Sequence, residues 1–459
     1  MQETYYRSWS IFVLGSIRLC LNTDYDYLHH VANYDILVRQ ILGVQDGMFR
    51  GRDFELQNIK DNVRLLDDAC TLRSTRDTLR EINTVIVQAG HGLVKKKGTE
   101  PLRIKVDSFV TEANVHFPTD YFILRTKYKY NLLWDSGRKC IDVLVLLMLA
   151  LCAAHVDTNS AYCTGWRKIK NWCKNLKNSM LSLCNATADK SKNRSVRLRK
   201  AAEDYLSVAR KLYDKVCNVK QLNDLSSEEE ALFKQLKYFR EMLGKHIDLV
   251  DRRLLKGETI PHEEKIFSTS YFVQSTSIFE PWVEWICKGK KHKPVELGTL
   301  TCVATDQWHF VVDWWAADHQ RDNQLLLPVI DRIRQNYSSV ASCSSDRGFF
   351  SKIDVDVIEL FDIKAFIPKK GKRNLADIQR ENDPDFIKAR HAHSAIESNI
   401  NELEHNGLDR CPDKGIKGMR RYIGLAVIAY NLRRIGKILQ RKDKEEAIGR
   451  KSTKLRRAA

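Results

Sequence analysis

The chain has 459 residues, and its 76 Lys and Arg against 58 Asp and Glu give a formal net charge of +18 at pH 7. This length is too great for one simple hydrophobic core, so we expect a globular protein of two or three domains. A strongly positive field attracts polyanions, which makes nucleic acid the leading expected partner; a basic or ribosome-associated enzyme is the alternative. The 12 Cys have no CxxC pair and no regular spacing, which argues against a disulfide framework or a zinc site and predicts reduced core thiols.

Two segments bear on the location of the protein. The most apolar run, "VLVLLMLALCAA" at 143–154, spans 12 residues, whereas a membrane helix needs roughly 20. It predicts a buried helix and no membrane partner. The N-terminal segment carries Glu3, Arg7 and Arg18 around a brief apolar centre and has no small-residue cleavage site, so it is not typical of a secretory signal. We therefore expect a cytoplasmic protein.

Residues 1–94 show mostly helical periodicity, for example at Leu56, Ile59 and Val63. This pattern predicts a small helical N-terminal domain. The domain ends at "KKKGTEP", 95–101, where lysines, a glycine and a proline interrupt the chain.

A strand is predicted directly after this break. The apolar residues Leu102, Ile104 and Val106 alternate with polar residues, of which Asp107 is the last. Alternation with a period of two is typical of a strand that is buried on one face only. The pattern therefore sets Asp107 on the polar side of a half-buried strand.

Residues 131–255 predict an all-helical insertion, because no strand pattern appears in them. A basic section that is rich in Lys, Arg and Trp lies at 166–174. An amphipathic stretch follows, with apolar residues at helical spacing: Leu198, Ala202, Leu206, Ala209, Leu212 and Val216.

Strands return with "GTLTCVATD", 298–306, and "HFVVDWWAAD", 309–318, which are close enough for a hairpin. Trp314 and Trp315 could stack on bases. Two tryptophans in a strand more often pack against the helices that cover the sheet, so we expect at least one of them in the core.

A helix at 323–337 leads to a strand that ends just before Asp346, although Pro328 weakens the helical pattern. The later elements are a helix, a strand, a group of helices and a charged tail that is expected to fray, at 352–362, 363–371, 384–439 and 441–459.

With the insertion set aside, three strands are followed by an alternation of strand and helix. That is the order of a ribonuclease-H-like α/β (α+β) fold, in which helices pack on a mixed sheet. Its core would have two parts, 100–130 and 256–440, on either side of the insertion. The first and fourth strands can lie side by side in this arrangement, so Asp107 and Asp346 can meet.

A helix crossing the sheet carries Glu397, which could supply a third carboxylate. Three carboxylates with open coordination positions suit Mg²⁺ or Mn²⁺. Two such ions can activate a water or a 3′-hydroxyl and stabilise the leaving oxygen during attack on a phosphodiester. Each acid also has a structural interpretation: Asp107 as a solvent-facing strand residue, Asp346 as a helix N-cap or turn residue, and Glu397 as a helix-surface glutamate.

Several blocks of sequence, in the same order over most of the chain, resemble those of bacterial insertion-sequence transposases of the DDE type. They are "VDSFVTEANVHFPTD" with "LLWDSGRKCID", then "DRGFFS", then "HSAIESNINELEHNGLDRCPDKGIKGMRRYIGLAVIAYNLRRIG". The segment "NYDILVRQILG" is similar to the helical domain that precedes the catalytic core of that family, and "KIFS", "IFEP" and "KGKKHKPVELG" are similar to its re-entry into the core.

This resemblance implies metal-dependent DNA cleavage and strand transfer, with Asp107, Asp346 and Glu397 as the catalytic and metal-binding acids. It implies Mg²⁺ or Mn²⁺ as cofactor, and the terminal inverted repeats of the element and a target DNA as partners. The helical domain at 1–94 would bind the repeats. We also expect a homodimer, because transposition needs two element ends to be brought together.

The sequence departs from a related signature that places Tyr, Arg, Glu and Lys around the third acid. Only Glu397 matches, because the other positions hold Arg390, His393 and Glu404. Glu402 and Glu404 remain alternative third acids. The helical face with Arg390 and His393 is nevertheless suited to a metal and a phosphate.

Near the C-terminus, Arg420 and Arg421 are further candidates for phosphate contact. Segments 121–130 and 268–277 interrupt blocks that run through in related proteins. Two alternatives therefore stay open beside the transposase: a ribonuclease-H-like nuclease that cuts without joining, and a non-catalytic DNA-binding protein derived from a transposase.

Overall fold

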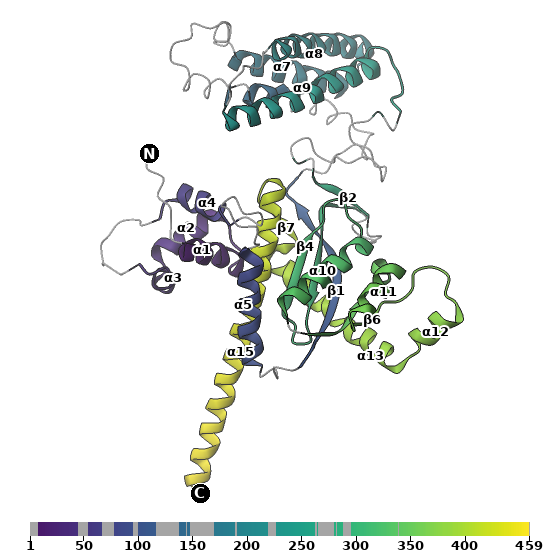
Figure 1. Ribbon diagram of the computed structural model, residues 1–459. Helices are drawn as coiled ribbons and strands as arrows, with labels where there is room; N and C mark the ends of the chain where they lie inside the picture. The colour runs from purple at the N-terminus through teal and green to yellow at the C-terminus, as the bar shows by residue number, and fades with distance from the viewer. Residues whose placement is uncertain are drawn as a thin grey trace. The chain divides into compact units, whose positions relative to one another are not determined.

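The computed structural model describes residues 8–44, 54–66, 78–94, 100–115, 137–143, 145–146, 169–188, 191–218, 226–261, 264, 280, 282–287, 295–337 and 339–458. The chain divides into two compact units, unit 1 with Met1–Val115 and Trp282–Ala459, and unit 2 with His116–Pro281 (Figure 1). Four predicted features lie wholly or mostly outside the described residues: the break at 95–101, the apolar run at 143–154 and the interruptions at 121–130 and 268–277.

Unit 1 contains a mixed sheet centred on β1 (Leu102–Ala113). Strand β3 (Glu296–Thr305) runs antiparallel to β1 on one side, and β5 (Val340–Ser345) runs parallel to it on the other. Next come β4 (Val311–Ala316), antiparallel to β3, and β6 (Lys364–Phe366), parallel to β5. These five strands follow the order β4-β3-β1-β5-β6 and confirm the predicted α/β class with a mixed sheet, including the hairpin of β3 and β4.

Two short strands that the sequence did not predict complete the sheet. Strand β2 (Glu284–Ile286) pairs with the start of β3, and β7 (Arg410–Cys411) pairs in parallel with the end of β1. Strand β5 pairs with β1 as far as Val106, and β7 pairs with β1 from Glu112 onward. Neither β5 nor β7 pairs with the residues of β1 between these two positions. The sheet is therefore open beside β1 over the residues that follow Val106.

Helices cover both faces of β1, although the sequence pattern predicted one polar face. Ile104 and Val106 belong to a core with α10 (Asp322–Asn336) and α11 (Lys352–Leu360). Phe109 and Ala113 belong to a second core with α14 (Ala395–Leu403) and α15 (Gly415–Ala458). Because β1 is central and has helices above and below it, even the Lys105 side chain is buried, and alternation in the sequence is not matched by exposure.

The N-terminal helices of unit 1 share the second of these cores with the sheet. They are α1 (Ser8–Cys20), α2 (Tyr25–Tyr34), α3 (Ile36–Ile41), α4 (Leu56–Val63) and α5 (Thr78–Leu93). Helix α1 and helix α5 both contact α15, and Figure 1 shows α5 running alongside it. The described helices between residues 8 and 94 thus belong to the same unit as the sheet.

The remaining helical predictions for unit 1 are confirmed. Helix α10 continues through Pro328, and α13 (Pro384–His393), α14 and α15 occupy the predicted C-terminal helical region. Helix α12 (Leu375–Glu381) lies before that region and was not predicted. The tail at 441–459 was expected to fray, but α15 is helical as far as Ala458. That stretch is rich in Lys, Arg, Glu and Ala and contains no Pro, which favours a helix.

Unit 2 has its own hydrophobic core, formed in its described part by α7 (Ile169–Ala188), α8 (Arg194–Cys217) and α9 (Ser227–Leu254) with Cys140, Ile141 and Val143. The amphipathic pattern predicted in α8 is confirmed, since Ala202, Leu206, Ala209, Leu212 and Val216 are buried. A capping box fixes the start of α9, where Ser226 accepts from the Glu229 N–H and Glu229 accepts from the Ser226 N–H. The described part of the predicted insertion is all-helical.

Several smaller expectations are also settled. Trp314 is buried in the core and Trp315 is half-buried. Nine of the 12 Cys lie in the described residues, and all nine are free thiols. Among the described helices, none has both the length and the apolar content to cross a membrane.

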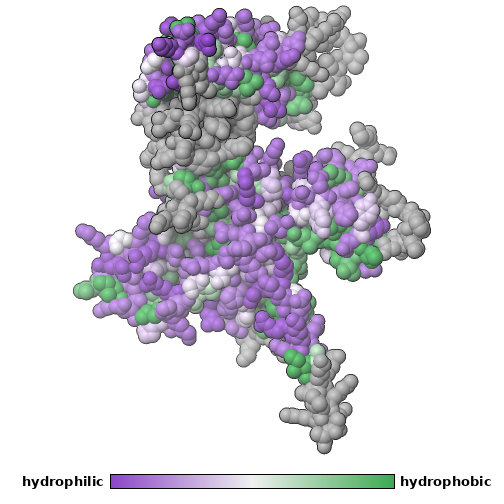
Figure 2. Space-filling model, turned by 180° about the vertical axis from the view of Figure 1, so that it is seen from behind, coloured by the Kyte–Doolittle hydropathy of each residue, from purple (hydrophilic) through white to green (hydrophobic). Residues whose placement is uncertain are grey.

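On the coloured part of the face in Figure 2, hydrophilic residues predominate and hydrophobic residues form small separate groups.

Candidate active site

Strands β1 and β5 bring the two predicted aspartates to the same place. Val106 of β1 lies opposite Ser345 of β5 in a parallel ladder. Continuing this register by one residue sets Asp107 beside Asp346, and neighbouring strands lie about 4.8 Å apart. Both strands run in the same direction and β5 ends at Ser345, so Asp346 lies at the carboxyl end of β5, beside the middle of β1. Open α/β sheets bind their ligands at the carboxyl ends of their strands.

The two carboxylates also share one face of the sheet. Phe109 packs in the core with α14, and Asp107, two positions earlier, points to the same side because strand side chains alternate. Ser344 is two positions before Asp346, and its Oγ is 3.3 Å from Nδ1 of His393 on α13. The face covered by α13 and α14 is therefore the one that carries the acids.

The surroundings of Asp346 argue against the capping role that the sequence left open. Asp346 precedes a short 3-10 helix, Arg347–Phe349, but within the described stretch 339–458 its side chain makes no capping hydrogen bond to that helix. The side chain is 70% exposed, and its Oδ1 lies 3.6 Å from Nε2 of His393. The carboxylate is therefore open to a ligand from solvent.

Gly348, two positions after Asp346, packs closely against Asp322. A Cβ on Gly348 would lie 2.9 Å from Oδ2 of Asp322 at the start of α10. The other oxygen of Asp322, Oδ1, accepts a hydrogen bond of 2.6 Å from the Ser108 hydroxyl. The Asp322 side chain thus packs between the turn after β5 and Ser108 of β1.

A pocket of about 270 Å³ opens at Asp346. Its charged lining consists of Asp346, Arg347, Arg390 and His393. His393 is buried, whereas Arg390 is exposed. One carboxylate beside two guanidinium groups can hold a phosphate through the arginines while the acid faces the reacting oxygen or a metal ion.

Buried groups near β1 report the electrostatics of the sheet. Cys302 on β3 lies opposite Ser108. Burial raises the pKa of its thiol well above the usual value, and the carboxylates of Asp313, Asp322 and Asp107 raise it further. On β1, burial lowers the pKa of the Lys105 side chain, and the Asp306 carboxylate partly offsets this lowering. These shifts show that the carboxylates of Asp107 and Asp322 lie near the buried thiol of Cys302.

Glu397 lies on α14, which packs against β1. The neighbouring Ile396 is buried in the core shared with Phe109, while Glu397 itself is exposed. In the described part of the chain, no group of three or more His, Cys, Asp or Glu side chains could hold a metal ion. The register of β1 and β5 thus sets Asp107 and Asp346 on neighbouring strands, and the described residues do not gather Glu397 with them into a group that could hold a metal ion.

The alternative third acids have other surroundings. The Glu402 carboxylate accepts a hydrogen bond from Lys437 of α15, an ion pair that already balances its charge. Glu404 begins a one-turn π-helix, Glu404–Leu408, that links α14 to β7. Of the three, only Glu397 is exposed, and it lies on α14, the helix that contacts β1.

The other predicted contacts to DNA fall into two groups. Arg390 and His393 line the Asp346 pocket. Arg420 is half-buried and lies 3.9 Å from Asp318. Arg421 is buried and donates to Asp413 and to the Arg64 carbonyl oxygen, so its guanidinium group serves the fold.

Three residues of the site were missed by sequence reasoning. Ser344 could have been found, because it lies two positions before Asp346 on the same strand and therefore on the same face. Arg347 follows Asp346 directly and is part of the block "DRGFFS". Asp322 has no local signal in the sequence, since its role depends on contacts to Ser108 and Gly348 that only the fold creates.

Comparison of the whole chain with models of protein families, with curated proteins and with solved structures found no match. The function is therefore inferred from the arrangement of the sheet, from the chemistry of the Asp346 pocket and from the sequence blocks.

Proposed function

We propose that the chain is a DDE transposase of an insertion sequence, which binds the terminal inverted repeats of its element and catalyses metal-dependent DNA cleavage and strand transfer. The observation that supports this most is the register of β1 and β5, which sets Asp107 beside Asp346. The strand order β4-β3-β1-β5-β6, with three antiparallel strands followed by two parallel ones, is the order expected of a ribonuclease-H-like core.

The donor set fits Mg²⁺ or Mn²⁺. Mg²⁺ usually keeps several waters and binds one or two carboxylates together with substrate phosphates, so a closed cage of three protein ligands is not required. Asp107 and Asp346 would supply two carboxylates, and Glu397 a third from α14. Two bound ions would activate the attacking water or 3′-hydroxyl and stabilise the leaving oxygen.

The other residues of the pocket would hold the substrate and orient the acids. Arg347 and Arg390 would bind phosphate oxygens, for which the planar guanidinium group is well suited. His393 would hold the Asp346 carboxylate in position, because its Nε2 faces that carboxylate and its Nδ1 faces Ser344. Ser344 and His393 would thus be positioning residues rather than catalytic ones.

The reaction defines the partners. Cleavage and joining act on double-stranded DNA, both at the element ends and at the target. Two ends must be joined in one event, so the proposed active form is a homodimer. The proposed site of action is the cytoplasm, where a bacterial chromosome is located.

A second candidate function is supported by a different observation. The described residues hold no group of three acids, histidines or cysteines close enough for a metal ion. A non-catalytic DNA-binding protein derived from a transposase would have the same fold without needing that group. The two candidates differ in catalysis and agree on binding.

The test is cleavage of a labelled duplex that carries the terminal repeat of the element, with Mg²⁺, by the wild type and by Asp346→Asn. Cutting and joining by the wild type alone would support the transposase. Cut ends that are never joined would instead indicate a ribonuclease-H-like nuclease. Binding of the duplex by both proteins without any cutting would select the non-catalytic protein.

A further inference from the structure

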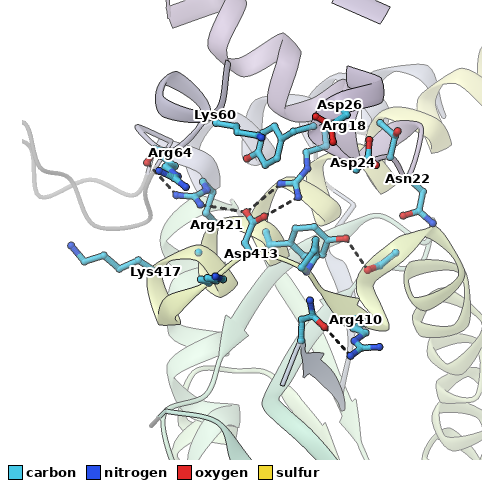
Figure 3. Close-up of a pocket in the computed structure, with 18 of the residues that line it drawn as sticks. Arg18, Asn22, Asp24, Asp26, Lys60, Arg64, Arg410, Asp413, Lys417 and Arg421 are labelled. Carbon is cyan, nitrogen blue, oxygen red and sulfur yellow. Dashed lines mark hydrogen bonds and ion pairs between the residues drawn. The ribbon is translucent and has the colours of Figure 1, made fainter. Parts of the chain in front are cut away.

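A second cavity of unit 1 lies away from the Asp346 pocket. Its volume is about 1070 Å³, and its walls come from the N-terminal helices, from the region of β7 and from the start of α15 (Figure 3). Five of its lining residues are exposed or half-buried cations: Lys60, Arg64, Arg410, Lys414 and Lys417. We call this cavity the cationic hollow.

Buried charges form the floor of the cationic hollow. The Asp413 carboxylate accepts hydrogen bonds from Arg18 at 2.8 and 3.2 Å and from Arg421 at 3.3 Å. One negative charge thus meets two positive ones. Among the described residues, Nε of Arg18 and Nε of Arg421 have no hydrogen-bond partner. The floor therefore carries excess positive charge and spare donors.

The start of α15 adds a second feature that favours an anion. Lys414, Lys417 and Arg421 line the hollow at the N-terminus of this helix, and its first turn contains no acid. The first N–H groups of a helix lack intrahelical partners, and the helix dipole there is positive. Phosphate groups bind readily at such a position.

The acids of the hollow restrict where an anion can sit. Figure 3 shows Asp24 and Asp26 on one side, and Arg64, Arg421 and Lys417 on the other. Asp24 also accepts a hydrogen bond from the Tyr27 N–H and so caps α2. The open, cationic side of the hollow is therefore formed by α4 and the start of α15.

We propose that the cationic side of this hollow binds backbone phosphates of a DNA strand. The inference rests on the proposed function for the identity of its ligand, and the position of the hollow supports that ligand. Asn114 follows β1 and lines the hollow, and Arg410 lies opposite Glu112 of β1. Seven residues of strand separate Asp107 from Asn114, which is about 23 Å.

This separation can be expressed as a number of nucleotides. Phosphates follow one another at about 3.4 Å along the axis of a duplex strand. A strand whose scissile phosphate lies at Asp346 would thus reach the hollow about seven nucleotides away. The cavity can contain several phosphates, and its cations come from α4, from β7 and from the start of α15. The hollow would position the strand without reading its sequence.

The test compares DNA binding by Lys60→Ala/Lys417→Ala with the wild type, using a fluorescently labelled duplex at salt concentrations from about 50 to 200 mM. We expect the slope of log affinity against log salt to fall by about 2, because two phosphate contacts are lost. The matched control is Lys372→Ala/Lys444→Ala, which removes two exposed lysines outside the hollow. Circular dichroism of both variants verifies folding.

An unchanged slope in the folded hollow variant, or an equal loss in the control, would overturn the inference. Stabilisation of the wild type by inorganic phosphate without any binding of the duplex would also overturn it, because the ligand would then be a small phosphate compound. Binding is measured here without cleavage. A wild type that binds DNA through the hollow and never cuts would keep this inference while removing the transposase proposal.

Discussion

Asp346 and Asp413 are two carboxylates of the same unit in opposite surroundings. The side chain of Asp346 is 70% exposed and has a histidine ring 3.6 Å away. The side chain of Asp413 is 9% exposed and is held by Arg18 and Arg421, which are themselves buried. A desolvated charge must be paired, whereas an exposed charge contributes little to stability. The difference therefore indicates that Asp413 stabilises the fold, while Asp346 is accessible to a ligand.

Removing the buried carboxylate should have the largest effect. Asp413→Ala would leave Arg18 and Arg421 with uncompensated buried charges, which costs about 3–5 kcal/mol of unfolding free energy. Urea denaturation of the full chain measures this loss. The control is Asp26→Ala, an exposed acid in the first turn of α2 that lines the same hollow and should cost less than about 1 kcal/mol. Equal losses would mean that burial does not distinguish the two acids.

The next effect concerns the turn that presents Asp346. Gly348→Ala would place a Cβ 2.9 Å from Oδ2 of Asp322 and so push aside the side chain that accepts the hydrogen bond from Ser108 of β1. A carboxylate at the end of a side chain can move, so we expect a cost of about 0.5–1.5 kcal/mol, the size of that one hydrogen bond, and a lower cleavage rate. Gly436→Ala is the control, since that helical glycine has no atom within 4 Å of its Cβ position and should gain stability. A neutral Gly348→Ala would show that Asp322 moves freely.

A smaller effect is expected when the positioning of Asp346 is weakened. His393→Ala removes the ring that faces both Asp346 and Ser344. Residues that orient a metal ligand typically contribute 10- to 100-fold, so we expect a loss of about that size in cleavage rate. The Mg²⁺ concentration for half-maximal rate should also rise, which a purely structural role would not cause.

His391→Ala is the matched control for that variant, because His391 is exposed on the same helix, where its backbone carbonyl oxygen accepts a hydrogen bond from the Ser394 hydroxyl. If both histidine variants lowered the rate equally with an unchanged Mg²⁺ requirement, His393 would not orient Asp346.

The contrast between the two aspartates also explains what sequence reasoning could reach. Hydrophobic periodicity located β1, β3, β4, β5 and the long helices, and the strand order made it possible to expect Asp107 and Asp346 on neighbouring strands. These predictions depend on local patterns and on a small set of sheet topologies. The same reasoning assigned Arg420 and Arg421 alike to DNA, although Arg421 is buried against Asp413.

The features that were missed depend on residues far apart in the chain. Arg18 and Asp413 are 395 positions apart, so no local pattern pairs them. Strand β7 has only two residues, Arg410–Cys411, and exists because the chain after α14 returns to the end of β1. The burial of Lys105 follows from helices on both faces of β1, which alternation along one strand does not reveal.

The smallest expected effect is the change in stability caused by Asp346→Asn. Because the carboxylate is exposed and does not cap the helix after it, its replacement should alter the unfolding free energy by less than about 0.5 kcal/mol. Asp385→Asn, at an exposed acid on α13 that pairs with Lys364, should be equally neutral and should retain cleavage. Urea denaturation and the cleavage assay on both variants separate the two properties. A loss of more than about 1.5 kcal/mol for Asp346→Asn would mean that this acid holds the turn together, as Asp413 holds the floor of the cationic hollow, and a loss of cleavage would then no longer identify a ligand of the metal ion.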